Sequence, residues 1–230
     1  MAWRERVCVP LEVPQASGLT ALDDGTFAVV SDEGGVYRAN RDGSAELWVA
    51  APALDDLEGI CRDPSGALFV VSERTGDVSR IEDGEVTTCG TLASIGRKRN
   101  KGWEGLAYRP ARFGGPHFIA CHERSPRRLG VFDPVTLSTV AILRLPKATR
   151  RALADLSDLT VDPETGHWLV LSDESARIAE LRYEDGELAH LDAFRVDVGK
   201  REKPEGLTFD ADGRLWMATD GDPHLRCFAR

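Results

Sequence analysis

The sequence predicts an all-β protein, a five-bladed β-propeller of four-stranded antiparallel blades, forming a single domain over residues 1–230. Three observations predict this fold. A unit of about 40–50 residues recurs five times, and each unit consists of short strand-like segments separated by turns that contain Gly or Pro. The third observation concerns closure, because the last unit lacks a strand that the N-terminus can supply. A six-bladed ring is the alternative, whereas two stacked β-sandwiches would explain neither the repeat nor the missing strand.

Each unit carries an anchor near its start, glycine in four units of five, and an acid at the far end of its second strand. The anchors are Gly18, Gly59, Gly105, Asp158 and Gly206. The acids are Asp32, Glu73, Glu123, Asp173 and Asp220. Successive anchors are separated by 41, 46, 53 and 48 residues, and the acids follow their anchors by 14, 14, 18, 15 and 14. The one long spacing arises in the third unit, where PARFGG (residues 110–115) extends the first turn.

The strands of the first unit are expected at GLTAL, TFAVV, VYRAN and AELWVA, separated by DDG, DEGG and RDG. Glycine supplies positive φ at such turns and aspartate bonds its own backbone, so these separators have a physical role. In all five units the second strand is apolar at consecutive positions: FAVV, LFVV, FIAC, WLVL and LWMA. This pattern is typical of a sheet whose two faces are both packed. A helix is expected only within residues 145–156, between the third and fourth units.

The last unit, residues 205–230, has room for three strands. The strand-like segment RERVCVPLEV, residues 4–13, is expected to complete this blade, closing the ring and removing an exposed edge. Such pairing would bring Cys8 near Cys227. However, the five cysteines are odd in number and form no CxxC pair, which favours reduced thiols in a cytoplasmic protein.

Composition limits the partners. A net charge of −9 argues against nucleic acid and against an anionic membrane surface as the main partner. No apolar stretch approaches the ~18 residues of a membrane span, and the N-terminus lacks the apolar core of a signal peptide. We therefore expect a soluble protein, a monomer by default, whose partner is a small molecule.

The repeat predicts a mouth rich in carboxylates at one end of the central channel. Inner strands run along the axis, so the residues at their starts meet at one face. Glu58, Glu104 and Glu205 take these positions, Ser17 and Ser157 replace them in two units, and Asp158 follows Ser157. Carboxylates gathered in this way need protonation or a cation, and oxygen ligands without a histidine or cysteine cluster favour Ca²⁺ ahead of Mg²⁺. The acids at the far ends of the units are either turn formers or additional ligands.

Basic residues precede three of these positions and suggest a collar for an anionic ligand, a phosphoester or a carboxylate. The candidate ligand-binding residues are Arg74, Lys101, Trp103, Arg124 and Lys203. Alternatively, the basic loops are solvated and Trp103 packs between blades. His122 stands where the other units have Ser or Thr, so His122 and Glu123 are the candidate catalytic pair. A histidine that only forms a hydrogen bond is the alternative.

Four segments carry a family resemblance: DLEGI…VVSER, NKGWEGLAY…HERSP, DLSDLTVDPETGHWLVLSDES and PEGLTFDADGRLWMATD. They resemble successive motifs of the SdiA-regulated (YjiK-type) propeller family, which is similar to the esterase-like phytase family. The resemblance covers residues 18–228 and implies a calcium-associated propeller with Glu58, Glu104 and Glu205 at the acidic positions. The first unit departs from the pattern at Ser17. Two functional classes remain: a calcium-dependent hydrolase of a phosphoester, ester or lactone, and a non-catalytic propeller that binds a small molecule or a protein and holds structural calcium.

Overall fold

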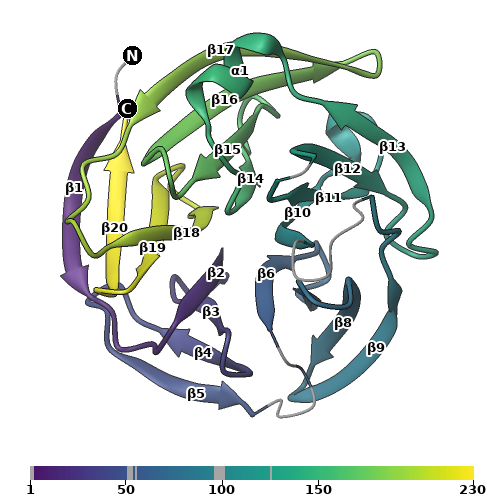
Figure 1. Ribbon diagram of the computed structural model, residues 1–230. Coiled ribbons are helices and arrows are strands. Elements are labelled where there is room, and N and C mark those ends of the chain that lie inside the picture. Colours follow the sequence, from purple (N-terminus) through teal and green to yellow (C-terminus); the bar gives the residue numbers. More distant parts are fainter. Residues whose placement is uncertain (1–2, 51–53, 55, 96–101, 125) are drawn as a thin grey trace.

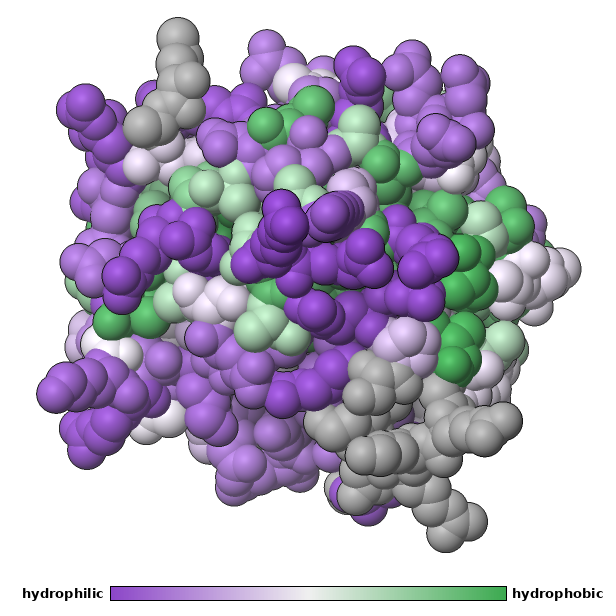
Figure 2. Space-filling view, turned by 45° about the horizontal axis from the view of Figure 1, so that its top comes forward, coloured by the Kyte–Doolittle hydropathy of each residue, from purple (hydrophilic) through white to green (hydrophobic). Residues whose placement is uncertain are grey.

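The computed structural model describes residues 3–50, 54, 56–95, 102–124 and 126–230. These residues form five four-stranded antiparallel sheets arranged in a ring (Figure 1), which confirms the five-bladed β-propeller. We number the blades 1 to 5 in chain order. The surface is mixed, with large hydrophilic areas and smaller hydrophobic ones (Figure 2), as the net charge of −9 suggests.

The strands follow one another from the axis outward in each blade. Blade 1 contains β2 (Ala16–Ala21), β3 (Phe27–Ser31), β4 (Gly35–Ala39) and β5 (Ala45–Val49). Blade 2 contains β6 (Leu57–Arg62), β7 (Leu68–Ser72), β8 (Asp77–Glu82) and β9 (Glu85–Thr91). Blade 3 contains β10 (Trp103–Arg109), β11 (His117–His122), β12 (Arg128–Phe132) and β13 (Thr139–Arg144). Blade 4 contains β14 (Leu159–Val161), β15 (Trp168–Ser172), β16 (Arg177–Glu184) and β17 (Glu187–Arg195). Blade 5 contains β18 (Lys203–Phe209), β19 (Leu215–Asp220), β20 (His224–Ala229) and β1 (Arg4–Pro10).

The N-terminal strand closes the ring as predicted. Strand β1 pairs antiparallel with β20 as the outermost strand of blade 5, so the first and last segments of the chain lie side by side (Figure 1). Arg226 of β20 forms ion pairs with Glu5 of β1 and with Glu202, whose Oε1 lies 2.8 Å from the arginine Nη2. Cys8 is exposed and Cys227 is buried, and both are free thiols.

Five clusters of buried apolar side chains make up the core, one between each pair of adjacent blades. The second strands β3, β7 and β15 are buried at every residue. Because each blade packs on both faces, these strands are apolar at consecutive positions, as the sequence indicated.

Two short helical segments lie in connections between strands. Helix α1 (Lys147–Ala152) falls within the predicted range, between blades 3 and 4. The 3-10 helix η1 (Ala111–Phe113) lies in the extended turn of blade 3 and was not predicted. No helix among the described residues is long and apolar enough to cross a membrane.

The anchor glycines allow the inner strands of adjacent blades to approach closely. A Cβ added to Gly59 would lie 2.5 Å from the backbone nitrogen of Leu106 in the next blade, and one added to Gly18 would lie 2.6 Å from the carbonyl oxygen of Glu58. Because real Cβ contacts are much longer, a side chain at these positions would push the blades apart. The repeat of glycine therefore reflects the packing of blade on blade.

Candidate functional site

A β-bulge marks the start of the inner strand in four of the five blades. In β6 the register with β7 shifts between Leu57 and Gly59, and equivalent shifts occur in β2, β10 and β18. The extra residues are Ser17, Glu58, Glu104 and Glu205. A bulged residue leaves the ladder and its side chain is re-aimed. The repeated Glu-Gly pair thus gives a glutamate that lies outside the strand ladder, followed by a glycine on which the next blade packs.

Two groups of three carboxylates form where blades 2 and 3 meet. Asp56, Glu58 and Glu73 form one group, and Glu73, Glu104 and Glu123 form the other. Within each group the candidate ligand atoms all lie within 4.8 Å of one another, and every member is partly buried. Glu73 belongs to both groups. Glu73, the acid at the far end of the second unit, therefore links the predicted metal ligands Glu58 and Glu104.

Glu73 is held in place by the backbone of both blades. Its amide N–H donates to the Asp56 carbonyl at 3.0 Å, and its carboxylate Oε1 accepts the Gly102 N–H at 3.1 Å. A Cβ on Gly102 would lie 2.0 Å from the carbonyl oxygen of Glu73, so the two segments are in direct contact. These contacts place the Glu73 carboxylate between the two bulged glutamates.

Asp56 is a member of the first group that the sequence analysis missed. It lies before β6 with a positive φ of 64°, a conformation that is uncommon for residues other than glycine. Its position two residues before Glu58 was the available signal. A second missed acid is Asp155, which is buried and accepts hydrogen bonds from the Ser172 hydroxyl and the Glu174 N–H.

Electrostatic repulsion and burial act together on the bulged glutamates. Burial, followed by the charges of Asp32, Glu73 and Asp56, raises the pKa of Glu58 to about 9. The pKa of Glu104 is raised well above its usual range, first by burial and then by neighbouring carboxylates that include Glu58 and Glu73. A positive charge brought among these carboxyls would favour their ionised form.

Glu205 faces the same mouth but lies outside both groups. Burial is the main cause of its raised pKa, and the charges of Asp173 and Glu58 add to it. Burial also raises the pKa of Asp173 to about 6. Ser17 and Ser157 stand where the other blades have Glu: Ser17 donates to Asp32, and Ser157 Oγ donates to the Pro204 carbonyl at 2.8 Å. Both three-carboxylate groups found among the described residues lie in the arc of blades 2 and 3.

Asp158, predicted as a metal ligand, is a member of neither carboxylate group. It is 1% exposed, and its Oδ2 accepts the Leu207 N–H of blade 5 at 2.6 Å. Its Oδ1 lies 2.4 Å from the position a Cβ on Gly105 would take. Asp158 occupies the anchor position, where the other units have glycine, and so packs between blades. Burial raises the pKa of its carboxyl well above the usual range.

Three of the candidate ligand-binding residues, Arg74, Arg124 and Lys203, form ion pairs with nearby acids. Arg74 Nε lies 3.6 Å from Asp56, and Lys203 Nζ lies 3.8 Å from Asp220. Arg124 pairs with Glu123, with Glu174 at 2.7 Å and with Asp155 at 3.5 Å. Lys101 falls outside the described residues. The three ion-paired residues therefore balance part of the negative charge at the mouth.

His122 and Trp103 lie in the interior of blade 3, each 2% exposed. Their rings meet edge to face with centroids 5.5 Å apart, and Trp103 makes a similar contact with Phe132 at 5.2 Å. His122 Nδ1 is 3.0 Å from the Pro126 carbonyl oxygen. This burial favours the alternatives left open for both residues, a hydrogen-bonding histidine and a packing tryptophan. The other member of the proposed catalytic pair, Glu123, belongs to a carboxylate group.

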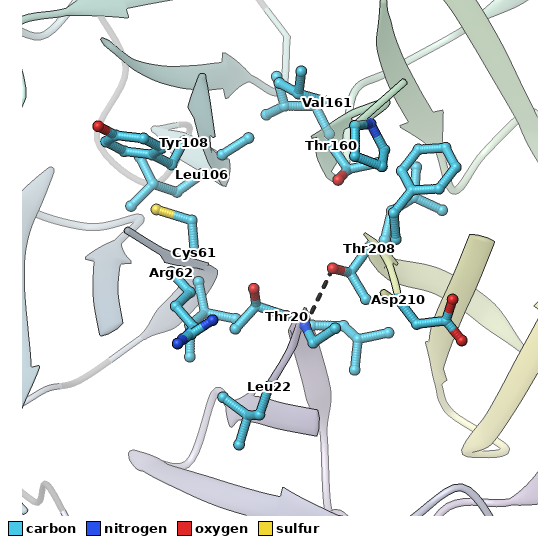
Figure 3. A pocket seen from close by; sticks show the side chains of 18 of the residues that line it. Thr20, Leu22, Cys61, Arg62, Leu106, Tyr108, Thr160, Val161, Thr208 and Asp210 are labelled. Carbon is cyan, nitrogen blue, oxygen red and sulfur yellow. Dashed lines mark hydrogen bonds between the residues drawn. The ribbon is translucent and has the colours of Figure 1, made fainter. Parts of the chain in front are cut away.

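The opposite end of the channel is chemically different. A pocket of about 260 Å³ is lined there by the far ends of all five inner strands, with Thr20, Cys61 and Thr208 among the side chains around it (Figure 3). Two aspartates line this pocket, and each pairs with an arginine: Asp23 lies 2.6 Å from Arg62, and Asp210 lies 3.2 Å from Arg41. The excess of carboxylates is therefore a property of one mouth.

Comparison with known proteins supports the fold. The sequence model of the SdiA-regulated family matches residues 75–225. A glutaminyl cyclase from Myxococcus xanthus superposes with a TM-score of 0.69 at 13% identity, over 99% of this chain and 95% of that one. A gluconolactonase from Xanthomonas campestris gives 0.56 at 16% identity, over 97% and 87%. Virginiamycin B lyase from Staphylococcus aureus gives 0.56 at 14% identity, over 99% and 74%. At these identities the similarity concerns the fold alone.

Proposed function

This chain belongs to the SdiA-regulated family, and from that premise we propose that it is a propeller that binds a divalent cation, Ca²⁺, at its acidic mouth. The observation that carries the proposal is the pair of three-carboxylate groups that share Glu73. Glu58 and Glu104 stand on either side of this shared acid, and Asp56 and Glu123 complete the groups.

The residues present fit calcium on size and on chemistry. Calcium binds oxygen at about 2.3–2.6 Å, so two oxygens on one ion lie at most about 5 Å apart. The separations within 4.8 Å in each group meet this limit. Magnesium, with bonds of about 2.0–2.1 Å, requires oxygens within about 4.2 Å of one another and a near-ideal octahedron. The groups contain neither histidine nor cysteine, the ligands that zinc prefers.

Electrostatics supports the same proposal. Each bulged glutamate is surrounded by other carboxylates, and this crowding together with burial opposes ionisation. A divalent cation among these side chains converts the repulsion between them into attraction to a shared charge. The Gly102 N–H and the backbone contacts of Glu73 hold the shared ligand in place without the ion.

As a second candidate, we propose that the cation site supports hydrolysis of an ester, a lactone or a phosphoester. The favouring observation is the number of ligands: each group offers three carboxylates, whereas calcium takes six to eight oxygens. With each carboxylate bound through one oxygen, positions are left for water and for a substrate oxygen. When bound, the ion would supply Lewis-acid polarisation of a carbonyl or phosphoryl oxygen. All carboxylates of the two groups come from blades 2 and 3, so they would hold the ion from one side of the mouth.

The cation site is tested by calcium titration of the wild-type chain, Glu73→Gln and a matched control, Glu85→Gln. Glu73 belongs to both groups, whereas Glu85 is exposed on β9. Gln preserves size and removes charge, so the Glu73 change should weaken calcium binding at least about tenfold, the loss of one charge-assisted ligand. The Glu85 change should leave the affinity at the wild-type value. Equal affinities for the two variants would contradict the site.

Hydrolysis is tested separately with p-nitrophenyl acetate, p-nitrophenyl phosphate and a δ-lactone, with calcium and with chelator. A metal-dependent hydrolase should lose at least about a hundredfold in rate in chelator, because Lewis-acid stabilisation amounts to several kcal/mol. Turnover that persists unchanged in chelator would contradict this mechanism. Absence of turnover with all three substrates would leave cation binding as the function and remove the hydrolase.

A further inference from the structure

The extended turn of the third unit builds a second pocket, which the proposed function does not use. Residues 110–115 contain η1 and reach across to the first turn of blade 4. A pocket of about 570 Å³ lies beside this turn, between blades 3 and 4. Its lining includes Arg109, Arg112, Phe113, His117, His167 and Tyr183.

The extended turn is fixed to blade 4 by two contacts. The ring of Phe113 packs on the backbone of Gly166, where a Cβ would lie 2.5 Å from the ring. Arg112 Nη2 donates to the Pro163 carbonyl at 2.8 Å. Gly114, with a positive φ of 111°, lies over the guanidinium of Arg109. The extended turn that forms the wall of the pocket is therefore fixed against blade 4.

Arg109 is buried beside this pocket without an acidic partner. It is 7% exposed, donates a hydrogen bond to the Phe113 carbonyl and stacks on Tyr183, 4.9 Å from the ring centroid. No carboxylate lies within 4.0 Å of its guanidinium in the part of the chain that the structure describes, and its buried Nε has no acceptor there. Arg226, equally buried, has two carboxylate partners, Glu5 and Glu202.

An unpaired cation in a buried place is unfavourable unless an anion reaches it. A neighbouring cation also lacks an acidic partner. Arg112 is exposed and has no carboxylate partner among the described residues. His117 Nδ1 is buried and also lacks an acceptor or donor there. Burial and the charge of Arg109 together lower the pKa of His117.

The pocket is remote from the cation site. Glu104 is the second residue of β10 and Arg109 is its last. A strand rises about 3.4 Å per residue, so the five steps between them separate the two ends by roughly 17 Å. A ligand at Arg109 therefore cannot share the carboxylates of the mouth.

Acids at the rim limit the size of the anion. Glu184 and Asp185 line the pocket opening and are exposed, and Glu184 pairs with Arg182 at 3.4 Å. Such acids repel a long polyanion but leave room for a small one. We propose that this pocket binds a small molecule through a phosphate or carboxylate group, which contacts Arg109 at the floor and Arg112 at the wall.

The test measures binding of inorganic phosphate and, separately, of acetate to the whole chain by calorimetry in chelator, with sodium chloride at equal ionic strength as the reference. Chelator separates the result from the proposed cation site. We expect one saturable site, weakened at least about tenfold in Arg109→Met because a charge-assisted pair is lost. Arg80→Met, which removes an exposed arginine paired with Glu82 in blade 2, should bind like the wild type.

Arg112→Met provides a second variant at an exposed position, in case the buried change prevents folding. It should weaken the same site, and NMR should show phosphate-dependent shifts at the amides of Gly114 and Gly166. Tighter phosphate than acetate would indicate a phosphorylated ligand, and the reverse a carboxylate. Absence of saturable binding of both anions, or an equal loss in the Arg80 and Arg109 variants, would overturn the proposal.

Discussion

The metal-free protein should lose stability as pH rises from about 4.5 to about 9, and Glu58 should account for much of this loss. The pKa of Glu58 is about 9 in the folded chain, against a usual value of 4.5. A carboxyl with a raised pKa favours folding below its unfolded pKa, and that contribution disappears as pH rises through the folded pKa. Each unit is worth about 1.36 kcal/mol, so the loss between pH 4.5 and pH 7 is about 3 kcal/mol.

The test uses the variant Glu58→Gln, whose side chain at position 58 cannot ionise. Urea unfolding followed by tryptophan fluorescence, in chelator at pH 5 and pH 7, gives the free energy of unfolding for each protein. The wild-type value should fall over this interval by about 2.5 kcal/mol more than that of the variant. Glu85→Gln, an exposed change on β9, should behave like the wild type.

Two results would refute the reasoning. If the wild type and Glu58→Gln show the same dependence on pH, the carboxyl is not held in a buried and negatively charged environment. If the metal-free wild type becomes more stable between pH 5 and pH 7, the effect of the mouth on stability has the opposite sign. Calcium should remove most of the wild-type loss at pH 7, because it binds the ionised form in the folded state.

Three further predictions concern an ion pair, a contact between blades and a buried histidine. Glu202→Gln should lower the free energy of unfolding by about 3–5 kcal/mol, because it leaves the buried Arg226 without its main partner; a loss below about 1 kcal/mol in urea, the value of a surface pair, would contradict this role in closure. Gly59→Ala should cost about 1–3 kcal/mol by overpacking, since its methyl group would meet the backbone of Leu106 at 2.5 Å; an unchanged urea midpoint would remove the packing argument. His122→Ala should lower the melting temperature and leave calcium affinity at the wild-type value, and a loss of affinity would return this histidine to the site.

The architecture could be predicted because blade packing imposes a spacing on the chain. Glycine is needed wherever one inner strand lies against the next, so Gly59 and Gly105 appear at regular intervals. The missing strand of the last unit and the strand-like N-terminus together indicated closure. The regular spacing of the glycines and the strand count of each unit can both be read directly from the sequence.

The site was only partly predictable because it depends on single-residue register. The bulge leaves Glu58 unpaired and re-aimed, whereas Asp158 occupies the anchor position and is buried between blades. One step along a strand reverses the face of a side chain, and the repeat places Asp158 one step after the glutamate position, at the anchor. Asp56 was missed because its place depends on a positive φ before the strand. The position of Glu73 before Arg74 favours a turn former over a ligand, and only the contact between blades 2 and 3 places Glu73 in both carboxylate groups.

A crystal structure of the chain grown with calcium would show directly whether the acidic mouth holds the ion. We expect an ion between blades 2 and 3, bonded to Glu73 and to carboxylate oxygens of Glu58 or Glu104, at distances of about 2.3–2.6 Å. Anomalous scattering would identify the ion as calcium. Ordered water alone between these carboxylates at saturating calcium, or an ion that makes no bond to Glu73, would contradict it.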